Sequence, residues 1–381
     1  MTQEISIALI GQQFMGRAHS NGWSQVPRFF ELALRPHLHT VAARDPDSLG
    51  EFARRWGWAN WTVDWASIAQ DEEIALVDIG TPNHLHAQQA LAMLAAGKHV
   101  ACEKPLAGTL EDARAMRDAA RDATGKTFVW FNYRRCPAIG LAYRLIREGR
   151  LGAIRHVRAA YLQSWGGPKT PHSWRFQKSL AGSGAHGDLN AHIVDLARFL
   201  TGDEIVEVSG AIAETFVTER PLADGSGVET SDVDDCVLFL ARFGSGAVGS
   251  FEASRLATGH QNRNMIELNG ELGSVRFDFE DMNVLWFFDG AEGAGGEREA
   301  GWRRIMCTSA GEHPYAEAWW PAAHGLGYEH GFVNMAADIL RVLGGETPEL
   351  PLPDFEDAYQ TQRVLDAALR AARERRAVAL D

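Results

Sequence analysis

Short apolar runs alternate with amphipathic stretches over roughly the first 130 residues, and this alternation limits the possible folds more than any other feature of the sequence. Strand-length runs separated by helix-length segments are typical of βαβ units, which build a parallel sheet covered by helices. Leu85–Ala96 carries apolar side chains at helical spacing, and Gly97 follows where a glycine commonly ends a helix. The sequence therefore predicts an α/β first domain over residues 1–132. Its expected strands are Ile5–Ile10, His39–Ala43, Ala75–Ile79, Lys98–Cys102 and Thr127–Phe131.

Beyond about residue 205 the sequence becomes a succession of strand-like runs joined by short turns. Gly244–Gly246 and Asn269–Gly270 have the composition of tight hairpin connections. These features predict a second α/β domain over residues 133–381, built on a large open, mostly antiparallel sheet. One face of this sheet should pack on another subunit, so we expect a homodimer or homotetramer. The expected strands are Val206–Val217, Asp235–Phe243, Ala247–Ala253, Met265–Asn269, Ser274–Phe279 and Val284–Phe288.

The length and the last third of the chain agree with this division. A chain of 381 residues exceeds the size of about 250–300 residues at which single hydrophobic cores stop growing. Gly290–Gly301 is rich in glycine and glutamate and is predicted to be a loop. Phe355–Arg376 is strongly helical, and we expect this C-terminal helix to pack back on the first domain.

Charge and cysteine content exclude several classes of protein. The chain has 37 Lys and Arg against 50 Asp and Glu, a formal net charge of −13, which argues against a nucleic-acid partner. No apolar stretch approaches the roughly 18–20 residues of a membrane span, and the start MTQEISIALIG has no basic leader or cleavage site. The four cysteines are widely spaced and fit neither a disulfide scaffold nor a zinc site. We therefore expect a soluble cytoplasmic protein.

A dinucleotide-binding turn follows the first predicted strand. Gly11 and Gly16 are the outer glycines of a GxGxxG pattern, whose glycines admit a pyrophosphate to a helix N-terminus, but Gln13 replaces the middle glycine. At the end of the second strand, an acid would hold the ribose of NAD and an arginine would accept the 2′-phosphate of NADP. Arg44 and then Asp45 stand there, which leaves the choice between NAD and NADP open.

Three further signatures carry a family resemblance. They are Thr81–His86 (TPNHLH), Glu103-Lys104-Pro105, and Gly182–His192 (GSGAHGDLNAH). In this order and spacing they resemble the glucose–fructose oxidoreductase/inositol dehydrogenase (Gfo/Idh/MocA) family. Phe14–Ser20, Phe131–Arg135 and Ser173–Phe176 are similar to its levoglucosan-dehydrogenase-like branch. The resemblance implies a Rossmann domain, an open-faced α/β domain, a nicotinamide cofactor and oxidation of a pyranose hydroxyl, typically at C3.

Cofactor contacts are expected at the carboxyl edge of the first sheet, where ligands of open α/β sheets bind. NAD is the expected cofactor, with NADP as the open alternative. The expected cofactor-binding residues are Gly11, Gln13, Phe14, Met15, Gly16, Arg44, Thr81, Pro82, Asn83, His86, Glu103 and Lys104.

Proton transfer is assigned to three residues. Lys104 ends a predicted parallel strand, and a neighbouring cationic nicotinamide should lower its pKa, which makes it a hydrogen-bond donor or a base. Asp188 and His192 are four residues apart at a helix start and should share one face. The resemblance makes His192 the base on the substrate hydroxyl, with Asp188 contacting substrate or orienting the charge. A metal site on His186, Asp188, His192 and Asp195 is not expected, because HExxH is missing and hydride transfer here needs no Lewis acid beyond Lys104.

The substrate site is expected to be locally basic. Lys169, His172 and Arg175 form either a solvated loop or a pocket for an anionic group such as a carboxylate or sulfonate. An anionic substrate would favour a second function, an NAD-dependent glycosidase that oxidises, eliminates, hydrates and reduces a glycoside such as a sulfoquinovoside. A third is a non-catalytic NAD-binding regulator. The expected substrate-binding residues are Tyr133, Arg134, Trp165, Lys169, His172, Trp174, Arg175, Asp188, His192 and His330.

Overall fold

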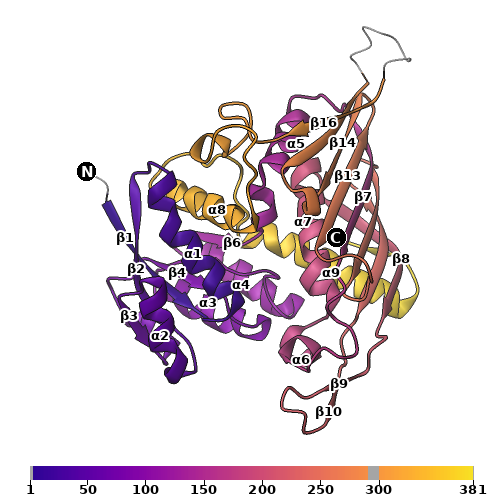
Figure 1. Ribbon diagram of the computed structural model, residues 1–381. Coiled ribbons are helices and arrows are strands. Elements are labelled where there is room, and N and C mark those ends of the chain that lie inside the picture. Colours follow the sequence, from indigo (N-terminus) through magenta and orange to yellow (C-terminus); the bar gives the residue numbers. More distant parts are fainter. Residues whose placement is uncertain (1–2, 291–299, 381) are drawn as a thin grey trace. The chain divides into compact units, whose positions relative to one another are not determined.

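The structure, a computed structural model, describes residues 3–290 and 300–380 and divides into two compact units (Figure 1). The first unit comprises Met1–Arg135, Glu317–Trp319 and Gly327–Tyr359. The second comprises Cys136–Ala316, Trp320–Leu326 and Gln360–Asp381. The first unit therefore takes in residues from far along the chain, and the simple boundary at residue 132 stays a prediction.

The first unit is built on a six-stranded parallel sheet with the order β3-β2-β1-β4-β5-β6. Its predicted α/β fold is confirmed. Because the strand order reverses between β1 and β4, the carboxyl ends of these two strands flank the position where open α/β sheets bind ligands. The strands are β1 (Gln3–Ile10), β2 (Leu34–Ala42), β3 (Asn60–Thr62), β4 (Leu76–Ile79), β5 (His99–Cys102) and β6 (Thr127–Val129).

Helices of the first unit bury one apolar side against this sheet. Trp23 of α1 and Phe332 of α8 belong to one core cluster with Ile7, Leu9 and Val41 of the strands, and all five are at most 1% exposed. Burial of this apolar surface is the main force that holds the layers together. The helices are α1 (Phe14–Phe29), α2 (Pro46–Trp56), α3 (His86–Ala95), α4 (Leu110–Asp122), α8 (Tyr328–Leu343) and the start of α9 (Phe355–Glu374).

The second unit is built on a nine-stranded mixed sheet with the order β16-β15-β14-β13-β7-β12-β11-β8-β17. Among the strands in the described residues of this sheet, only the β7–β12 pair is parallel, so the predicted mostly antiparallel sheet is confirmed. The strands are β7 (Ile154–Leu162), β8 (Ile205–Glu214), β11 (Cys236–Phe243), β12 (Val248–Ser254), β13 (Arg263–Gly270), β14 (Gly273–Asp278), β15 (Val284–Asp289), β16 (Trp302–Met306) and β17 (Val378–Ala379).

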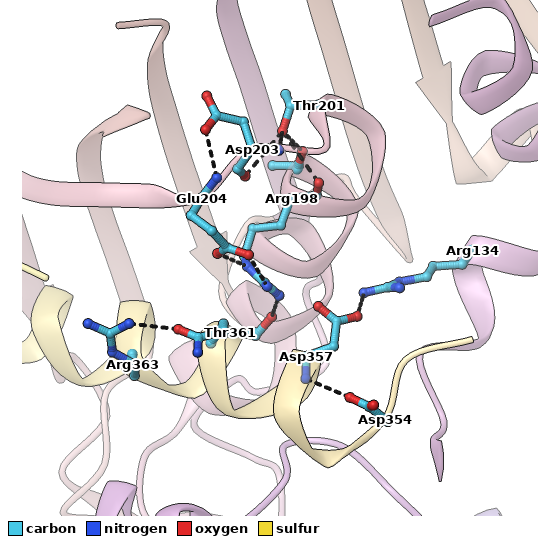
Figure 2. A network of polar contacts seen from close by, with 11 residues as sticks. Arg134, Arg198, Thr201, Asp203, Glu204, Asp354, Asp357, Thr361 and Arg363 are labelled. Carbon is cyan, nitrogen blue, oxygen red and sulfur yellow. Dashed lines mark hydrogen bonds and ion pairs between the residues drawn. The ribbon is translucent and has the colours of Figure 1, made fainter. Parts of the chain in front are cut away.

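Helices α5 (Pro137–Arg147), α6 (Lys178–Ala181) and α7 (Ala191–Thr201) complete the second unit, with a small hairpin of β9 (Glu219–Pro221) and β10 (Val228–Thr230). Helix α7 packs on β7 and β13. The part of α9 beyond Gln360 is tied to α7 by Arg198, whose Nη1 donates to Thr361 Oγ1 at 2.9 Å (Figure 2).

One expectation about the second unit is wrong, and another falls partly outside the described residues. Asn269–Gly270 is not the turn of its hairpin, because both residues still pair with β7 and β13 ends only at Gly270. The turn is Glu271–Leu272. Residues 291–299 of the predicted loop Gly290–Gly301 lie outside the described residues. None of the helices in the described ranges combines the length and the apolar character that crossing a bilayer requires.

Candidate functional site

The turn after β1 brings two backbones into close contact. Gly11 has a φ of +122°, and a Cβ there would lie 2.7 Å from the carbonyl oxygen of Gly80. A Cβ at Gly16 would lie 2.3 Å from the carbonyl oxygen of Gly11. Both separations are too short for a side chain, so the two outer glycines of the fingerprint are required by the fold itself. They lie where the order of the sheet reverses between β1 and β4.

The N-terminus of α1 faces solvent at the replaced glycine. Gln13 is the N-cap residue, is exposed, and makes no side-chain hydrogen bond to the first turn. Phe14 is 52% exposed and stacks on Tyr328 with ring centroids 6.1 Å apart. The first turn of α1 contains no acidic residue, so the positive end of its dipole is available to an anion.

At the end of β2 the two charged residues differ in what they do. The carboxylate of Asp45 accepts the Asp47 N–H at 3.2 Å and the Ser48 hydroxyl, and so caps α2. The bond from Ser48 lowers the pKa of Asp45 below its usual value. Arg44 is exposed beside it. The acid is therefore already occupied by the helix, and Arg44 is the nearby cation.

His86 joins the two loops that follow β4 and β5. It is fully buried, with Nδ1 3.1 Å from the Pro105 carbonyl and Nε2 2.9 Å from the Thr81 carbonyl. Burial lowers the pKa of His86, and a neutral imidazole donates to one of these oxygens at a time. In the same loop, the Thr81 hydroxyl donates to Gln89 Oε1 at 2.7 Å. The fold thus uses both nitrogens of His86, and its contact with a cofactor stays a prediction.

A buried ionic cluster of Asp78, His19 and Glu103 lies behind Lys104, and the sequence predictions do not include it. Asp78 of β4 and His19 of α1 are both fully buried, and His19 Nδ1 is 3.0 Å from Asp78 Oδ1. The indole N–H of Trp130 donates to Asp78 Oδ1 at 2.8 Å, and that of Trp23 donates to Oδ2 at 2.7 Å. One sequence signal was present: an aspartate inside the apolar run Leu76–Ile79, because a charge in a central strand must be paired.

Glu103 connects this cluster to Lys104. His19 Nε2 is 3.1 Å from Glu103 Oε1, and Glu103 Oε2 accepts the backbone N–H of Lys104 at 3.0 Å. Burial alone would lower the pKa of His19, but the carboxylates of Asp78 and Glu103 outweigh it and raise the pKa to about 9. An imidazolium held between two carboxylates fixes Glu103, and through it the backbone at Lys104.

Two of the predicted substrate residues, Arg134 and His330, have partners inside the first unit. Arg134 is 3% exposed, and its Nη2 lies 2.6 Å from Asp357 Oδ2 (Figure 2). Tyr133, in the same turn, is 4% exposed. His330 Nδ1 accepts the Gly327 N–H at 2.9 Å, and its ring packs edge-on against Trp319. The structure gives Arg134 and His330 roles in the fold, and the substrate contacts of all three stay predictions.

The glycine-rich segment before α7 is held by Asp234. A Cβ at Gly184 would lie 1.8 Å from the Asp234 carbonyl oxygen, so only glycine fits there. The Asp234 carboxylate accepts the backbone N–H groups of Gly184 at 2.8 Å and His186 at 2.7 Å. The chain then makes a π-helical turn, His186–Asn190, which leads directly into α7. Such widened turns are frequent at functional sites.

Asp188 and His192 are placed by this turn and by the sheet beneath it. Asp188 Oδ2 is 3.0 Å from Arg255 Nη2, a partner that the sequence did not indicate. Arg255 also lies over the ring of Trp165, 5.0 Å from its centroid. His192 is 6% exposed, and its ring centroid is 5.8 Å from that of Tyr161. The second unit thus gathers a carboxylate, a guanidinium, an imidazole and aromatic faces on one group of elements.

Lys169, His172 and Arg175 have different surroundings in the structure, and their shared contact with a substrate stays a prediction. His172 lines a cavity of about 430 Å³ whose other walls include the carboxylates of Glu229 and Asp232, and neither Lys169 nor Arg175 is among its lining residues. Lys169 is exposed. The guanidinium of Arg175 lies 4.5 Å from the ring centroid of its neighbour Trp174. The described residues contain no group of three or more His, Cys, Asp or Glu arranged to hold a metal ion.

Comparison with known families matches both halves of the chain. Residues 5–131 match the oxidoreductase family with an NAD-binding Rossmann fold, and residues 140–276 match the GFO/IDH/MocA C-terminal domain.

Full-length relatives point the same way. Levoglucosan dehydrogenase of Pseudarthrobacter phenanthrenivorans is 42% identical, over 97% of this chain and 96% of that protein. A solved structure of levoglucosan dehydrogenase with NADH and levoglucosan superposes with a TM-score of 0.93 at 42% identity and full coverage of both chains. An oxidoreductase domain protein from Kribbella flavida gives a TM-score of 0.94 at 47% identity, also over both full chains.

Proposed function

The chain belongs to the GFO/IDH/MocA oxidoreductase family, and on that premise we propose that it oxidises a secondary hydroxyl of a pyranose ring by hydride transfer to NAD. Its full-length similarity to levoglucosan dehydrogenase makes levoglucosan the first substrate to test, with C3 as the oxidised carbon. The observation that carries the proposal is the position of Lys104. It follows β5 at the carboxyl edge of the parallel sheet, and its backbone N–H is held by Glu103.

The residues at the turn after β1 fit a dinucleotide. Gly11 and Gly16 leave no room for side chains of their own, and the first turn of α1 offers unoccupied N–H groups to a pyrophosphate. Thr81, Pro82 and Asn83 follow β4 beside this turn and would line the nicotinamide. NAD, when bound, accepts the hydride from the carbinol carbon.

Proton transfer then falls to this chain's own side chains. As hydride leaves the carbinol carbon, the hydroxyl must lose its proton, and a general base near neutral pKa serves this best. We assign the role of that base to His192, and to Lys104 the role of a hydrogen-bond donor to the substrate. Asp188, paired with Arg255, is assigned to a neighbouring sugar hydroxyl.

A second copy of the chain is proposed to cover the outer face of the large sheet. Ile212 of β8, Leu240 of β11 and Val248 of β12 are exposed by 54%, 53% and 43% on neighbouring strands. Adjacent exposed apolar side chains of this kind commonly mark an interface. Light scattering after size exclusion should give a mass above that of one chain, and Leu240→Arg should reduce it.

One assay separates the candidate functions. The protein is incubated with NAD and a panel of pyranoses and pyranosides, and reduced cofactor and released aglycone are followed together. The proposal expects one reduced cofactor for each sugar oxidised. Release of aglycone with only catalytic NAD and no net reduction would instead establish a glycosidase, and NAD binding without either product would establish a regulator.

A further inference from the structure

One side chain interrupts an apolar row on the inner face of the large sheet. Along β13, buried and partly buried residues alternate, which places Asn264, Ile266 and Leu268 on one face. Ile266 and Leu268 are each 1% exposed, and Asn264, at the start of the row, is 0% exposed. A buried amide breaks a pattern that the rest of the strand follows, and such local departures concentrate at functional sites.

The amide of Asn264 is unsatisfied at both ends. Neither Nδ2 nor Oδ1 has a hydrogen-bond partner within the part of the chain that the structure describes, although both atoms are buried. Burial of an unpaired amide is unfavourable, and an apolar side chain of the same size would cost the fold less. The residue is therefore poorly explained by packing, and its two polar atoms point to a ligand that supplies the missing partners.

The surroundings indicate what such a ligand offers. Asn264 lies directly opposite Tyr161 in the antiparallel β13–β7 register, so both side chains project from the same face. The Tyr161 ring packs against His192, and its hydroxyl donates to Asn262 Oδ1 at 2.7 Å. Gln163 Nε2 donates to the same oxygen at 2.7 Å. Asn264 thus adjoins neutral donors and acceptors beside His192, a setting suited to hydroxyl groups.

We propose that Asn264 determines specificity by binding one hydroxyl of the sugar, donating from Nδ2 and accepting at Oδ1. This inference rests on the proposed function, because it takes the ligand to be the pyranose whose hydroxyl His192 deprotonates. A hydroxyl is both a donor and an acceptor, which matches the amide at both ends. A sugar that lacks this hydroxyl leaves the amide unpaired, so the site rejects it.

Sugar binding without turnover gives the test. The dissociation constant of levoglucosan is measured by calorimetry on protein saturated with NADH, for the wild type, Asn264→Leu, Asn264→Thr and the matched control Ile266→Val from the same row. If the wild type does not bind levoglucosan, the pyranose that it oxidises in the panel takes its place. We expect both Asn264 variants to bind the sugar about tenfold more weakly or worse. The NADH affinity of both variants and the sugar affinity of Ile266→Val should match the wild type.

Thermal unfolding without sugar separates binding from packing. If the Asn264 amide serves to bind sugar and does not stabilise the fold, Asn264→Leu should unfold at the same temperature as the wild type or higher. Wild-type sugar affinity in a folded Asn264→Leu or Asn264→Thr overturns the inference, whether or not the unfolding temperature falls. A wild type that binds NADH and no pyranose of the panel contradicts the proposed function itself.

Deoxy sugars identify the hydroxyl. The deoxy analogue that lacks the hydroxyl held by Asn264 should bind the wild type and Asn264→Leu equally, since the variant has already lost that contact. If every deoxy analogue loses the same factor of affinity in both proteins, the amide contacts no sugar hydroxyl and the inference fails.

Discussion

The carboxylate of Asp78 accepts hydrogen bonds from His19, Trp23 and Trp130, whereas neither polar atom of the Asn264 amide meets a partner in the described chain. Both side chains are fully buried. The first group is complete without a ligand, so it is suited to holding Glu103 and the backbone at Lys104 in one place. The second is incomplete, so it is suited to recognising what enters. A saturated polar network fixes position, and an unsaturated amide selects a partner.

The largest effect on turnover should come from replacing Lys104, whose backbone is held by the cluster of Asp78, His19 and Glu103. Lys104→Ala is expected to lower kcat by about 10²–10⁴-fold, because a positioned proton donor or base contributes on that scale. The unfolding temperature should stay near that of the wild type, so that the loss of turnover is not a loss of folded protein. Steady-state kinetics with a panel pyranose measures the loss, and full turnover by the variant would remove Lys104 from the mechanism.

Removing the centre of the cluster should cost stability. His19→Ala leaves the carboxylates of Asp78 and Glu103 buried without their shared cation, and breaking a buried pair in this way costs about 3–5 kcal/mol. Urea unfolding followed by fluorescence measures the change. As a control, Arg55→Ala breaks an ion pair whose side chains are more than 60% exposed and should leave the midpoint almost unchanged. Equal midpoints for wild type and His19→Ala would show that the cluster contributes nothing.

The same cluster predicts a pH dependence with a definite sign. The pKa of His19 is raised from 6.5 to about 9 in the fold, so the folded state holds the proton more tightly than the unfolded state. The stabilisation is fully present below about pH 6.5 and is lost as pH rises through about 9, a change of about 3 kcal/mol. Unfolding of wild type and His19→Gln should be compared from neutral to alkaline pH. A constant difference between them across this range would contradict the assignment.

A smaller effect should follow from a change at Glu103, which connects His19 to the backbone N–H of Lys104. Glu103→Gln keeps the shape of the side chain but leaves one carbonyl oxygen to serve both His19 and the Lys104 N–H. We expect kcat to fall by about tenfold with KM unchanged, because positioning of Lys104 is disturbed and sugar contacts are not. Kinetics over a range of pH tests this, and an effect on KM alone would instead indicate a contact with substrate.

The sequence predicts much of the fold and less of the candidate functional site. Apolar runs located five strands of the first sheet, and Gly11 and Gly16 indicated the dinucleotide turn, because these signals are local. The family resemblance carried by Thr81–His86, Glu103–Pro105 and Gly182–His192 is confirmed.

Contacts between distant residues could not be predicted in this way. Arg255 pairs with Asp188, Asp357 with Arg134, and Asp78 with His19, and each pair joins segments that only the folded chain brings together. Asn264 could not be predicted from the sequence either, although it is notable for contacts that it lacks. As one polar residue in a strand it gives no sequence signal, and its meaning depends on atoms that are buried and unpaired only in three dimensions.

The stoichiometry of cofactor reduction tests the proposed function most directly. Purified protein, NAD and levoglucosan, or the panel pyranose that the wild type binds, are mixed with the sugar limiting, and reduced cofactor and oxidised sugar are quantified together. A sugar dehydrogenase should form one NADH for each sugar oxidised, and Lys104→Ala should bind NADH but form almost none. Sugar cleavage without accumulation of NADH, or NAD binding with no reaction on any pyranose of the panel, would contradict the proposed function.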